Sequence, residues 1–340
     1  MDNARISERV TAIPGRRLVR ILCAAAIVGV ISSLTACRGG PRHDDRRPAT
    51  PGGQTSQPDT SSALVAPNHA MLFGYFYADG KYGDDLDAVS SHTNVYVACP
   101  ECYDTATDFT PSLRAALASP AVAAKAIVVV AGDPERWDQL LDALTPVWPR
   151  VRWVEVAHEA RIRREAMETR IRDWHARVAR RGLAKKPVAA MQDLCQTWQL
   201  LRCAFFDGWT SPLVDLVGIE AYLPIPDSGP QPGTLPWAVD YDPVHVTENL
   251  TSILTRAEAR ISEQQQIYVA VMAYDRNGEW KDAATLPVIA RATYEWARTR
   301  SRVTALLPFA YGRPGGAESY PDLEAALADI GGTILRGPAQ

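Results

Sequence analysis

The chain lacks the short motifs that carry several common chemistries. Its six histidines form no H-x-x-x-H or H-E-x-x-H spacing, so the sequence offers no metal-hydrolase ligand set, and we expect no metal or other cofactor. No serine lies in a G-x-S-x-G turn, which disfavours an esterase. The stretch "ADGKYGDD" (78–85) has the wrong glycine spacing for a dinucleotide phosphate loop.

An excess of basic charge is also missing. The 340 residues include 36 Lys and Arg against 39 Asp and Glu, which gives a net charge of -3. Removal of residues 1–36, with five arginines and two acids, would make the remainder more negative. This balance predicts no nucleic-acid partner.

The N-terminal segment predicts export. Residues 1–20 are basic, and the apolar run 21–30 that follows is too short to span a bilayer, as in a signal peptide. The sequence Leu34-Thr35-Ala36-Cys37 resembles a bacterial lipobox, which implies cleavage after residue 36 and a lipoprotein acylated at Cys37, for example with palmitate. The alternative is an ordinary signal peptide with an incidental cysteine.

The composition divides the chain into three regions. Residues 1–36 form the signal peptide, and 37–70 hold the attachment site and a linker with almost no large apolar side chain. Such a linker cannot bury enough surface to offset its ordering entropy. Residues 71–340 are long enough for one large domain. We therefore expect a lipid-anchored protein on the outer face of the bacterial cell membrane.

Four cysteines remain once Cys37 is acylated and the signal peptide is removed. An even number in an exported domain favours disulfide bonds. Three pairings are possible, and we favour the local pairs Cys195–Cys203 and Cys99–Cys102. A zinc site that includes "CPEC" (99–102) is the alternative, which the oxidising compartment disfavours.

Eight short apolar runs predict the strands of a barrel. Most are apolar along their whole length, as strands buried on both faces must be. The runs are 71–77, 93–98, 125–131, 151–157, 187–192, 214–222, 267–274 and 303–311. Amphipathic stretches between them include 135–147, 161–181, 244–264 and 286–300. Eight strands with helices between them predict a single α/β domain, a (β/α)8 TIM barrel. An open doubly wound sheet is the alternative.

The stretch 161–181 is the most charged of the expected helices, with eight arginines and three acids. Met167, Ile171, Trp174 and Val178 form an apolar stripe that would dock on the barrel. We interpret the arginines as a solvated face with i,i+4 ion pairs. Contact with anionic lipid headgroups is the alternative.

Carboxylates and aromatic side chains gather at the expected carboxyl ends of the strands, where barrel enzymes carry their chemistry. This combination suits a polyhydroxylated ligand, because aromatic faces cover sugar rings and carboxylates bind hydroxyls. The predicted substrate-binding residues are Tyr75, Tyr77, His158, Gln192, Asp193, Tyr222, Tyr274, Trp280, Tyr311 and Arg313.

Two of these strand ends resemble motifs of retaining (β/α)8 glycoside hydrolases. "VEVAHEA" (154–160) is similar to their W-E-x-x-N-E-P motif, which implies that Glu159 is the catalytic acid/base. "VDLVGIEAY" (214–222) resembles their sixth strand, with Glu220 in place of a histidine, and "VMAYDRNGEW" (271–280) resembles a strand of chitinase-like barrels. The seventh strand has no glutamate nucleophile, so Asp275 is the acid nearest that position.

Two functional hypotheses follow. In the first, the protein is a membrane-tethered glycoside hydrolase in which Glu159 protonates the leaving oxygen. Glu220 serves as nucleophile or base, and Asp275 is its substitute. In the second, the barrel binds a glycan without cleaving it.

Glu155 lies deeper in its strand than Glu159, and we interpret it as a buried structural carboxylate paired with a lysine or arginine.

Overall fold

The computed structural model describes residues 64–77, 84–100, 108–158, 162–191, 211–221, 243–273, 284–311 and 317–337. The chain divides into two parts, Met1–Thr60 and Ser61–Gln340, and every described residue belongs to the second part. The predicted signal peptide, Cys37 and most of the predicted linker lie outside the described residues, so they stay predictions.

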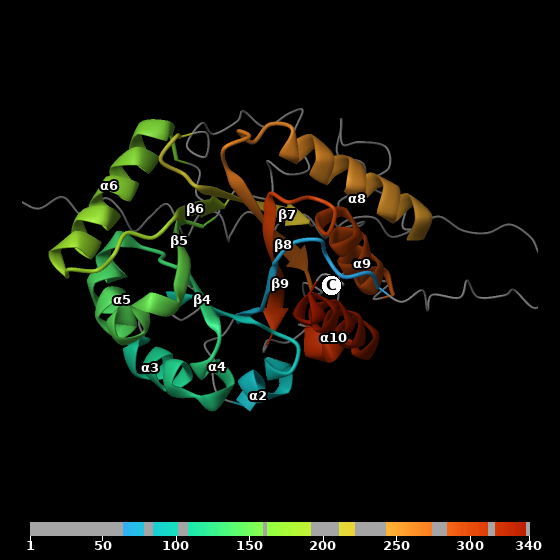
Figure 1. The fold of residues 1–340 in the computed structure, drawn as a ribbon, viewed down its shortest axis with the longest axis horizontal. Helices are drawn as coiled ribbons and strands as arrows, with labels where there is room; N and C mark the ends of the chain where they lie inside the picture. The colour runs from blue at the N-terminus through green and yellow to red at the C-terminus, as the bar shows by residue number, and fades with distance from the viewer. Residues whose placement is uncertain are drawn as a thin grey trace, which may run out of the picture. The chain divides into compact units, whose positions relative to one another are not determined.

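Within the described residues, parallel strands form one sheet that curls into a barrel (Figure 1). The strands are β1 (Leu72–Phe73), β2 (Phe76–Tyr77), β3 (Val95–Ala98), β4 (Ala126–Val130), β5 (Val151–Ala157), β6 (Val188–Met191), β7 (Leu216–Ala221), β8 (Gln266–Met272) and β9 (Val303–Tyr311). Because β1 and β2 both pair with β9, they act as two halves of the first barrel strand. Each of the eight predicted runs thus contains a barrel strand.

The seam between the first strand and β3 is closed by one residue, Asn94, through its backbone and its side chain. The ladder runs β1-β9-β8-β7-β6-β5-β4-β3, which leaves β1 and β3 to meet at its ends. The Asn94 backbone N–H donates to the Phe73 carbonyl at 3.0 Å, and the Phe73 N–H donates to Asn94 Oδ1 at 2.7 Å. Asn94 Nδ2 also donates to the Met71 carbonyl at 2.9 Å. These bonds satisfy backbone groups that a sheet edge would leave unpaired.

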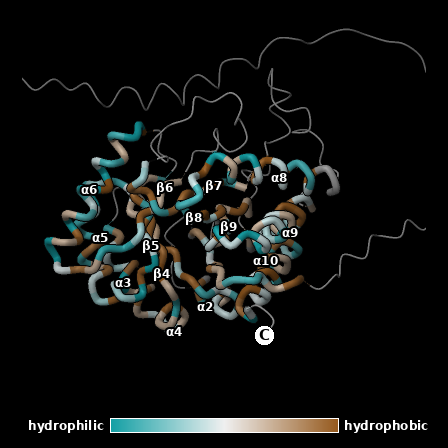
Figure 2. The backbone as a smooth tube through the Cα atoms, turned by 45° about the horizontal axis from the view of Figure 1, so that its top comes forward, coloured by the Kyte–Doolittle hydropathy of each residue, from teal (hydrophilic) through white to brown (hydrophobic). Residues whose placement is uncertain are grey.

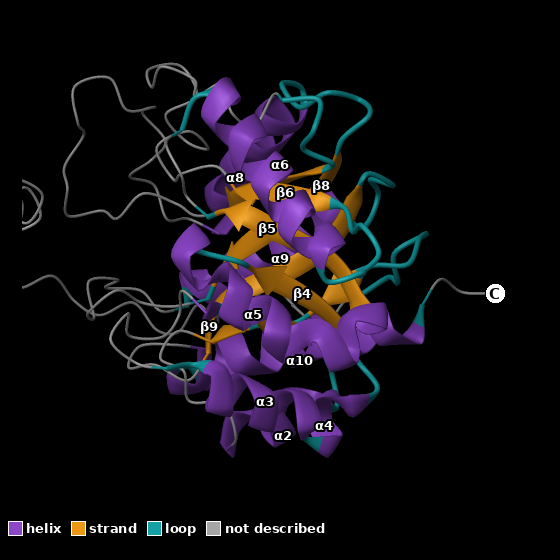
Figure 3. Cartoon of the chain, turned by 90° about the vertical axis from the view of Figure 1, so that its left-hand side faces the viewer, coloured by secondary structure: helices purple, strands orange, loops and turns teal. Residues whose placement is uncertain are grey.

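Helices surround the strands on the outside (Figure 3). The described α-helices are α2 (Asp84–Ser90), α3 (Thr110–Ala118), α4 (Pro120–Ala123), α5 (Trp137–Leu144), α6 (Arg164–Arg180), α8 (Pro243–Glu258), α9 (Thr285–Ala297) and α10 (Pro321–Arg336). Alternation of strands and outer helices with all-parallel pairing defines a (β/α)8 barrel, so the predicted fold is confirmed.

The strands are buried almost throughout, as their apolar sequences predict. Every residue of β3, β6 and β7 is buried, and β8 is exposed only at its first residue. In Figure 2, where hydrophobic residues are brown, brown stretches follow the barrel strands near the labels β4 and β5. Both faces of each strand therefore bury apolar surface, one in the barrel interior and the other against the helices.

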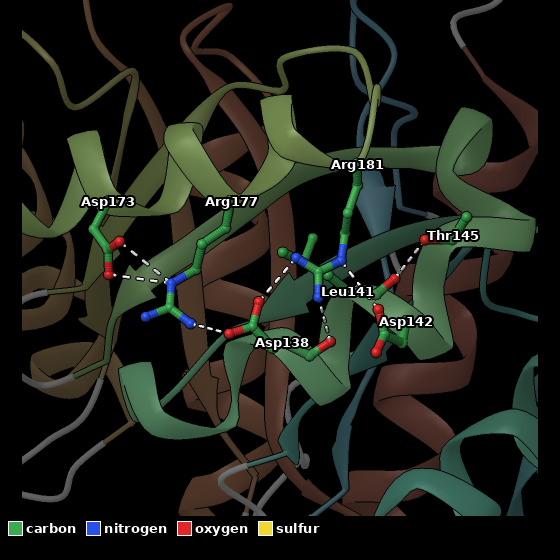
Figure 4. Close-up of polar contacts among 7 residues, drawn as sticks. All are labelled: Asp138, Leu141, Asp142, Thr145, Asp173, Arg177 and Arg181. Atoms are coloured by element: carbon green, nitrogen blue, oxygen red, sulfur yellow. Dashed lines mark hydrogen bonds and ion pairs between the residues drawn. The ribbon is translucent and has the colours of Figure 1, made fainter.

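Helix α6 packs on the barrel through the predicted stripe, since its buried residues are Met167, Ile171, Trp174 and Val178. Its polar face carries ion pairs, two of them between Glu168 and the arginines at 164 and 172. Further pairs join α6 and the residue after it to α5 (Figure 4). This α5–α6 charge network consists of Asp138, Asp142, Asp173, Arg177 and Arg181. The predicted ion-paired face is therefore present on this helix.

The described chain begins with a segment that contacts the barrel. Leu64 packs against the core, and the Tyr294 hydroxyl donates to the Val65 carbonyl at 2.6 Å. His69 Nε2 lies 2.7 Å from the Val303 carbonyl. Residues 64–69, which the sequence assigns to the linker, thus contribute contacts to the folded part.

Candidate functional site

A buried carboxylate lies inside the barrel. Glu155 is the fifth residue of β5, and its side chain is 0% exposed. The Tyr268 hydroxyl of β8 donates to its Oε2 at 2.6 Å, and Oε1 lies 2.7 Å from His158 Nδ1. Strands β5 and β8 are separated in the sheet by β6 and β7, so their side chains meet across the interior. The expectation that Glu155 pairs with a lysine or arginine is wrong, because its partners are a tyrosine and a histidine.

The Tyr268 ring is held in place from two sides. It stacks on Trp153 of β5, with ring centroids 4.7 Å apart and an interplanar angle of 29°. The neighbouring strand β7 has a glycine next to the ring: a Cβ on Gly218 would lie 2.3 Å from Tyr268 Cζ and from its hydroxyl oxygen. Gly218 is the register partner of Tyr268, so the ring lies over the bare backbone beside it. The missing side chain at Gly218 lets the tyrosine reach Glu155.

His158 lies just past the end of β5, among the carboxyl ends of the strands, which we call the barrel mouth. Its ring contacts Phe76 of β2, with centroids 5.8 Å apart, and Phe76 contacts Phe309 of β9 at the same separation. The His158 side chain is 17% exposed. His158 thus joins the buried carboxylate to the partly exposed mouth, where it forms an ion pair with Glu155 when protonated.

Glu220 lies at the fifth position of β7 and is 1% exposed. By the alternation of a strand it faces the same side as Gly218, which is the side that Tyr268 occupies. This places a second carboxylate in the interior, one step nearer the mouth than the Gly218–Tyr268 pair. Gln192 and Arg313, two of the predicted substrate-binding residues, lie outside the described residues. The chemistry available here is that of two interior carboxylates, one of them linked to a histidine.

Few of the other predicted site residues are described. Tyr75 is 1% exposed, with its hydroxyl 3.1 Å from His92 Nε2 and its ring against Phe73. Tyr77 and Tyr311 are register partners at the ends of the first and last barrel strands, so their backbones lie side by side at the barrel mouth. The predicted site residues outside the described part are Glu159, Asp275, Gln192, Asp193, Tyr222, Tyr274, Trp280 and Arg313. Their roles stay predictions.

The cysteine pairings are also largely outside the described part. Cys99 follows β3 and is 1% exposed. Cys102, Cys195 and Cys203 are not among the described residues, so both predicted pairs stay predictions.

Sequence reasoning missed the residues that surround Glu155. Tyr268, Trp153 and Gly218 were not among the candidates, although a tyrosine in the otherwise aliphatic "IYVAVM" (267–272) marks a polar group in the barrel interior. Only the register, which aligns Gly218 with Tyr268, shows why the glycine is needed.

Two further searches cover only the described part of the chain. Within it, no group of three or more His, Cys, Asp or Glu side chains is placed to hold a metal ion. None of the helices in that part is both long and apolar enough to cross a membrane.

No model of a known protein family matches the sequence, and no curated protein matches it either. Solved structures of barrel glycoside hydrolases are similar to it. A GH5_18 protein from Bifidobacterium longum subsp. infantis is 10% identical, with 82% of this chain and 80% of that chain covered and a TM-score of 0.48. A GH128 endo-β-1,3-glucanase from Amycolatopsis mediterranei, in complex with laminaritriose, is 12% identical, with 76% and 98% covered and a TM-score of 0.47.

A Haloferax volcanii malate synthase is also similar, at 8% identity, with 78% of this chain and 73% of that chain covered and a TM-score of 0.42. Such distant likenesses concern the fold, which supports many unrelated chemistries. Function therefore has to be argued from the side chains of this chain.

Proposed function

We propose that this barrel is a glycoside hydrolase-like protein that acts on a polysaccharide or glycan outside the cell. The observation that carries the proposal is the placement of Glu220 in the barrel interior near the strand ends. Glu220 is a buried carboxylate, and glycosidic cleavage uses a pair of carboxyl groups. Glu159 is the proposed proton donor, Glu220 the nucleophile or base, and Asp275 its substitute.

The test is the release of reducing ends from soluble polysaccharides of different linkage, including β-1,3-glucan and β-1,4-mannan. We expect Glu220→Gln to lower turnover by at least about 100-fold while substrate affinity largely survives, because charge stabilisation of the oxocarbenium-like transition state is lost. Glu258→Gln is the matched control, since Glu258, the last residue of α8, pairs with Arg300 in the loop after α9. Equal turnover in the two variants would exclude a catalytic Glu220.

A non-catalytic glycan-binding barrel is the second candidate. It is favoured by the seventh barrel strand, because β8 (Gln266–Met272) contains no carboxylate. Under this hypothesis the protein is retarded in polysaccharide gels without releasing reducing ends. Tyr222→Ala or Trp280→Ala then weakens the retardation, because aromatic faces cover sugar rings.

We also propose that the barrel is tethered to the outer face of the bacterial cell membrane through an acyl group on Cys37. The support is the lipobox-like sequence 34–37. Mass spectrometry of the mature N-terminus should find an acylated Cys37, and Cys37→Ser should release the protein or leave it uncleaved. An unmodified cysteine in the wild-type protein would contradict the tether.

A further inference from the structure

We propose that the end of the barrel opposite the mouth binds the anionic headgroup layer of a phospholipid bilayer, so that the candidate site is directed away from the membrane. We call this end the basal face: it consists of the described loops that precede β3 to β9, the segment 64–70 and the last turn of α10. Most of the teal loops in Figure 3 lie at this end, on the right. The proposal rests on the proposed tether for the presence of the membrane, and it does not depend on the ligand of the mouth.

The first observation is the charge of the basal face. The described loops that precede β3 to β9 hold nine lysines and arginines against two acids, whereas acids outnumber basic residues in the whole chain. The basic residues are Lys125, Arg150, Arg181, Lys185, Lys186, Arg260, Arg298, Arg300 and Arg302, and the acids are Asp215 and Glu263. The arginines at 181, 298 and 300 pair with carboxylates of neighbouring helices. The six other basic residues still outnumber the two acids.

These positive charges are concentrated at the starts of β5 and β6. Arg152 is exposed at the second position of β5, and Lys185 and Lys186 precede β6. Burial and the charge of Arg152 lower the pKa of Lys186, while burial and the charge of Lys185 lower the pKa of His175 on α6. Arg150 donates to main-chain carbonyls, which stabilise its charge without cancelling it. Like charges this close repel one another, and an anionic surface beside them relieves the repulsion.

The second observation is the place where the described chain enters the barrel. The Val65 carbonyl accepts from Tyr294 near the end of α9, and His69 contacts the carbonyl of the first residue of β9, so this segment lies on the basal face. Leu64 follows Cys37 by 27 positions. A flexible chain of that length spans about 30 Å on average. An acyl group on Cys37 would therefore keep the basal face close to the bilayer, with the mouth at the far end.

The third observation favours a lipid surface over a soluble polyanion. Among the described residues, Val65 and Leu335 are the large hydrophobic side chains that are exposed, at 58% and 42%. Leu335 also lies on the basal face, because it belongs to the last turn of α10, and a Cβ at Gly331 one turn earlier would meet the carbonyl of His92 before β3. Apolar side chains beside basic ones suit the boundary between headgroups and acyl chains, a layer that a soluble polyanion does not offer.

The test is co-sedimentation with lipid vesicles of the mature chain without its acyl group, residues 37–340 with Cys37→Ser. At about 0.05 M NaCl we expect binding to vesicles of phosphatidylglycerol and phosphatidylcholine, and little binding to phosphatidylcholine alone. The basal variant combines Arg152→Gln, Lys185→Gln and Lys186→Gln. It should bind at least about tenfold more weakly, because each basic residue near an anionic surface adds to the attraction.

The control variant removes the same charge from the side of the barrel. It combines Arg163→Gln, Arg164→Gln and Arg172→Gln, three exposed arginines at the start and on the outer face of α6. Its binding should change by less than about twofold, and the melting temperatures of both variants check that the fold is kept. Equal losses in the two variants overturn the proposal, as does a lack of binding to the anionic vesicles. Binding to heparin but not to these vesicles would assign the basal face to a soluble polyanion and also overturn it.

Hydrogen exchange of the acylated protein on the same anionic vesicles measures the orientation. Amides of the loop 181–187 should exchange more slowly than in detergent micelles, while those at the end of β5, at the mouth, should be unchanged. Slower exchange at the mouth with no change at 181–187 overturns the orientation. If Cys37 carries no acyl group, the proposed tether fails, and the vesicle binding of the non-acylated chain still decides whether the basal face binds lipid.

Discussion

The α5–α6 charge network and the Glu155 site place carboxylates in opposite surroundings. Asp138 and Asp142 of the network are 51% and 61% exposed, and each faces arginine guanidinium groups. Glu155 is 0% exposed, and its partners are a tyrosine hydroxyl and a histidine ring. Water solvates the first set whether or not the pairs form, whereas Glu155 depends wholly on two protein donors. Abundant charge therefore marks a surface here, and buried carboxylates mark the candidate site.

Truncation of the buried carboxylate should have the largest effect on stability. Glu155→Ala removes the acceptor of Tyr268 and the partner of His158 and leaves a cavity, so we expect a loss of about 3 kcal/mol in the free energy of unfolding. Asp142→Ala makes a matched change in the exposed network and should cost less than about 1 kcal/mol. Urea titration of both variants measures the difference. Similar losses would remove the distinction between the two regions.

The glycine beside Tyr268 gives the next largest effect. A Cβ at Gly218 would lie 2.3 Å from the ring, so Gly218→Ala should force Tyr268 away from Glu155 and cost about 2 kcal/mol. Gly332→Ala in α10 is the control, because its Cβ meets only Arg336 Nη1 at 3.6 Å. Alanine favours a helix over glycine, so the control should gain about 0.5–1 kcal/mol. If Gly218→Ala left the free energy of unfolding unchanged, the Tyr268 ring would have room to move.

The sequence predicts the fold of this chain better than its site, for a physical reason. Strands buried on both faces are apolar throughout, so runs such as 125–131 and 267–274 reveal the barrel without knowledge of any contact. The Glu155 site depends on β5, β7 and β8 meeting across the interior, and only register brings Gly218 beside Tyr268. The motif resemblance and the position along one strand favour Glu159 over Glu155, and neither contains information about Tyr268 on the far strand.

A half-buried lysine tests how burial acts on a cation. Burial lowers the pKa of Lys125 to about 8, and its Nζ donates to the Ser90 carbonyl at 3.1 Å. Between pH 8 and 10 the unfolded chain keeps this proton and the native state loses it, so stability should rise with pH. Solvent screens the site, so the rise should be on the order of 1 kcal/mol. Lys125→Met should abolish it in thermal melts.

Another buried group, Tyr294, sets the pH above which stability stops rising. Burial raises the pKa of Tyr294 to about 12 from its ordinary value of 10. Above pH 10 the unfolded state therefore loses a proton that the native state keeps, and stability falls. A rise between pH 8 and 10 that persists in Lys125→Met would have to come from a different group.

The smallest effect is expected in the α5–α6 charge network itself. Arg181 Nη1 lies 2.8 Å from Asp138 and its Nε lies 3.0 Å from Asp142. Burial alone would lower the pKa of Arg181, but the hydrogen bonds that it donates to these carboxylates raise it. After Arg181→Gln, water still solvates the carboxylates of Asp138 and Asp142, so neither is left unpaired in an apolar environment. We expect a loss below about 1 kcal/mol.

The dependence on salt separates this network from the barrel interior. Ionic screening reaches exposed pairs and leaves buried ones nearly unaffected. Raising NaCl from about 0.05 to 0.5 M should therefore shrink the cost of Arg181→Gln toward zero, while the cost of Glu155→Ala stays the same. Urea titrations at both salt concentrations measure this. A salt-dependent cost for Glu155→Ala would mean that solvent reaches the carboxylate, and the contrast between the two regions would not hold.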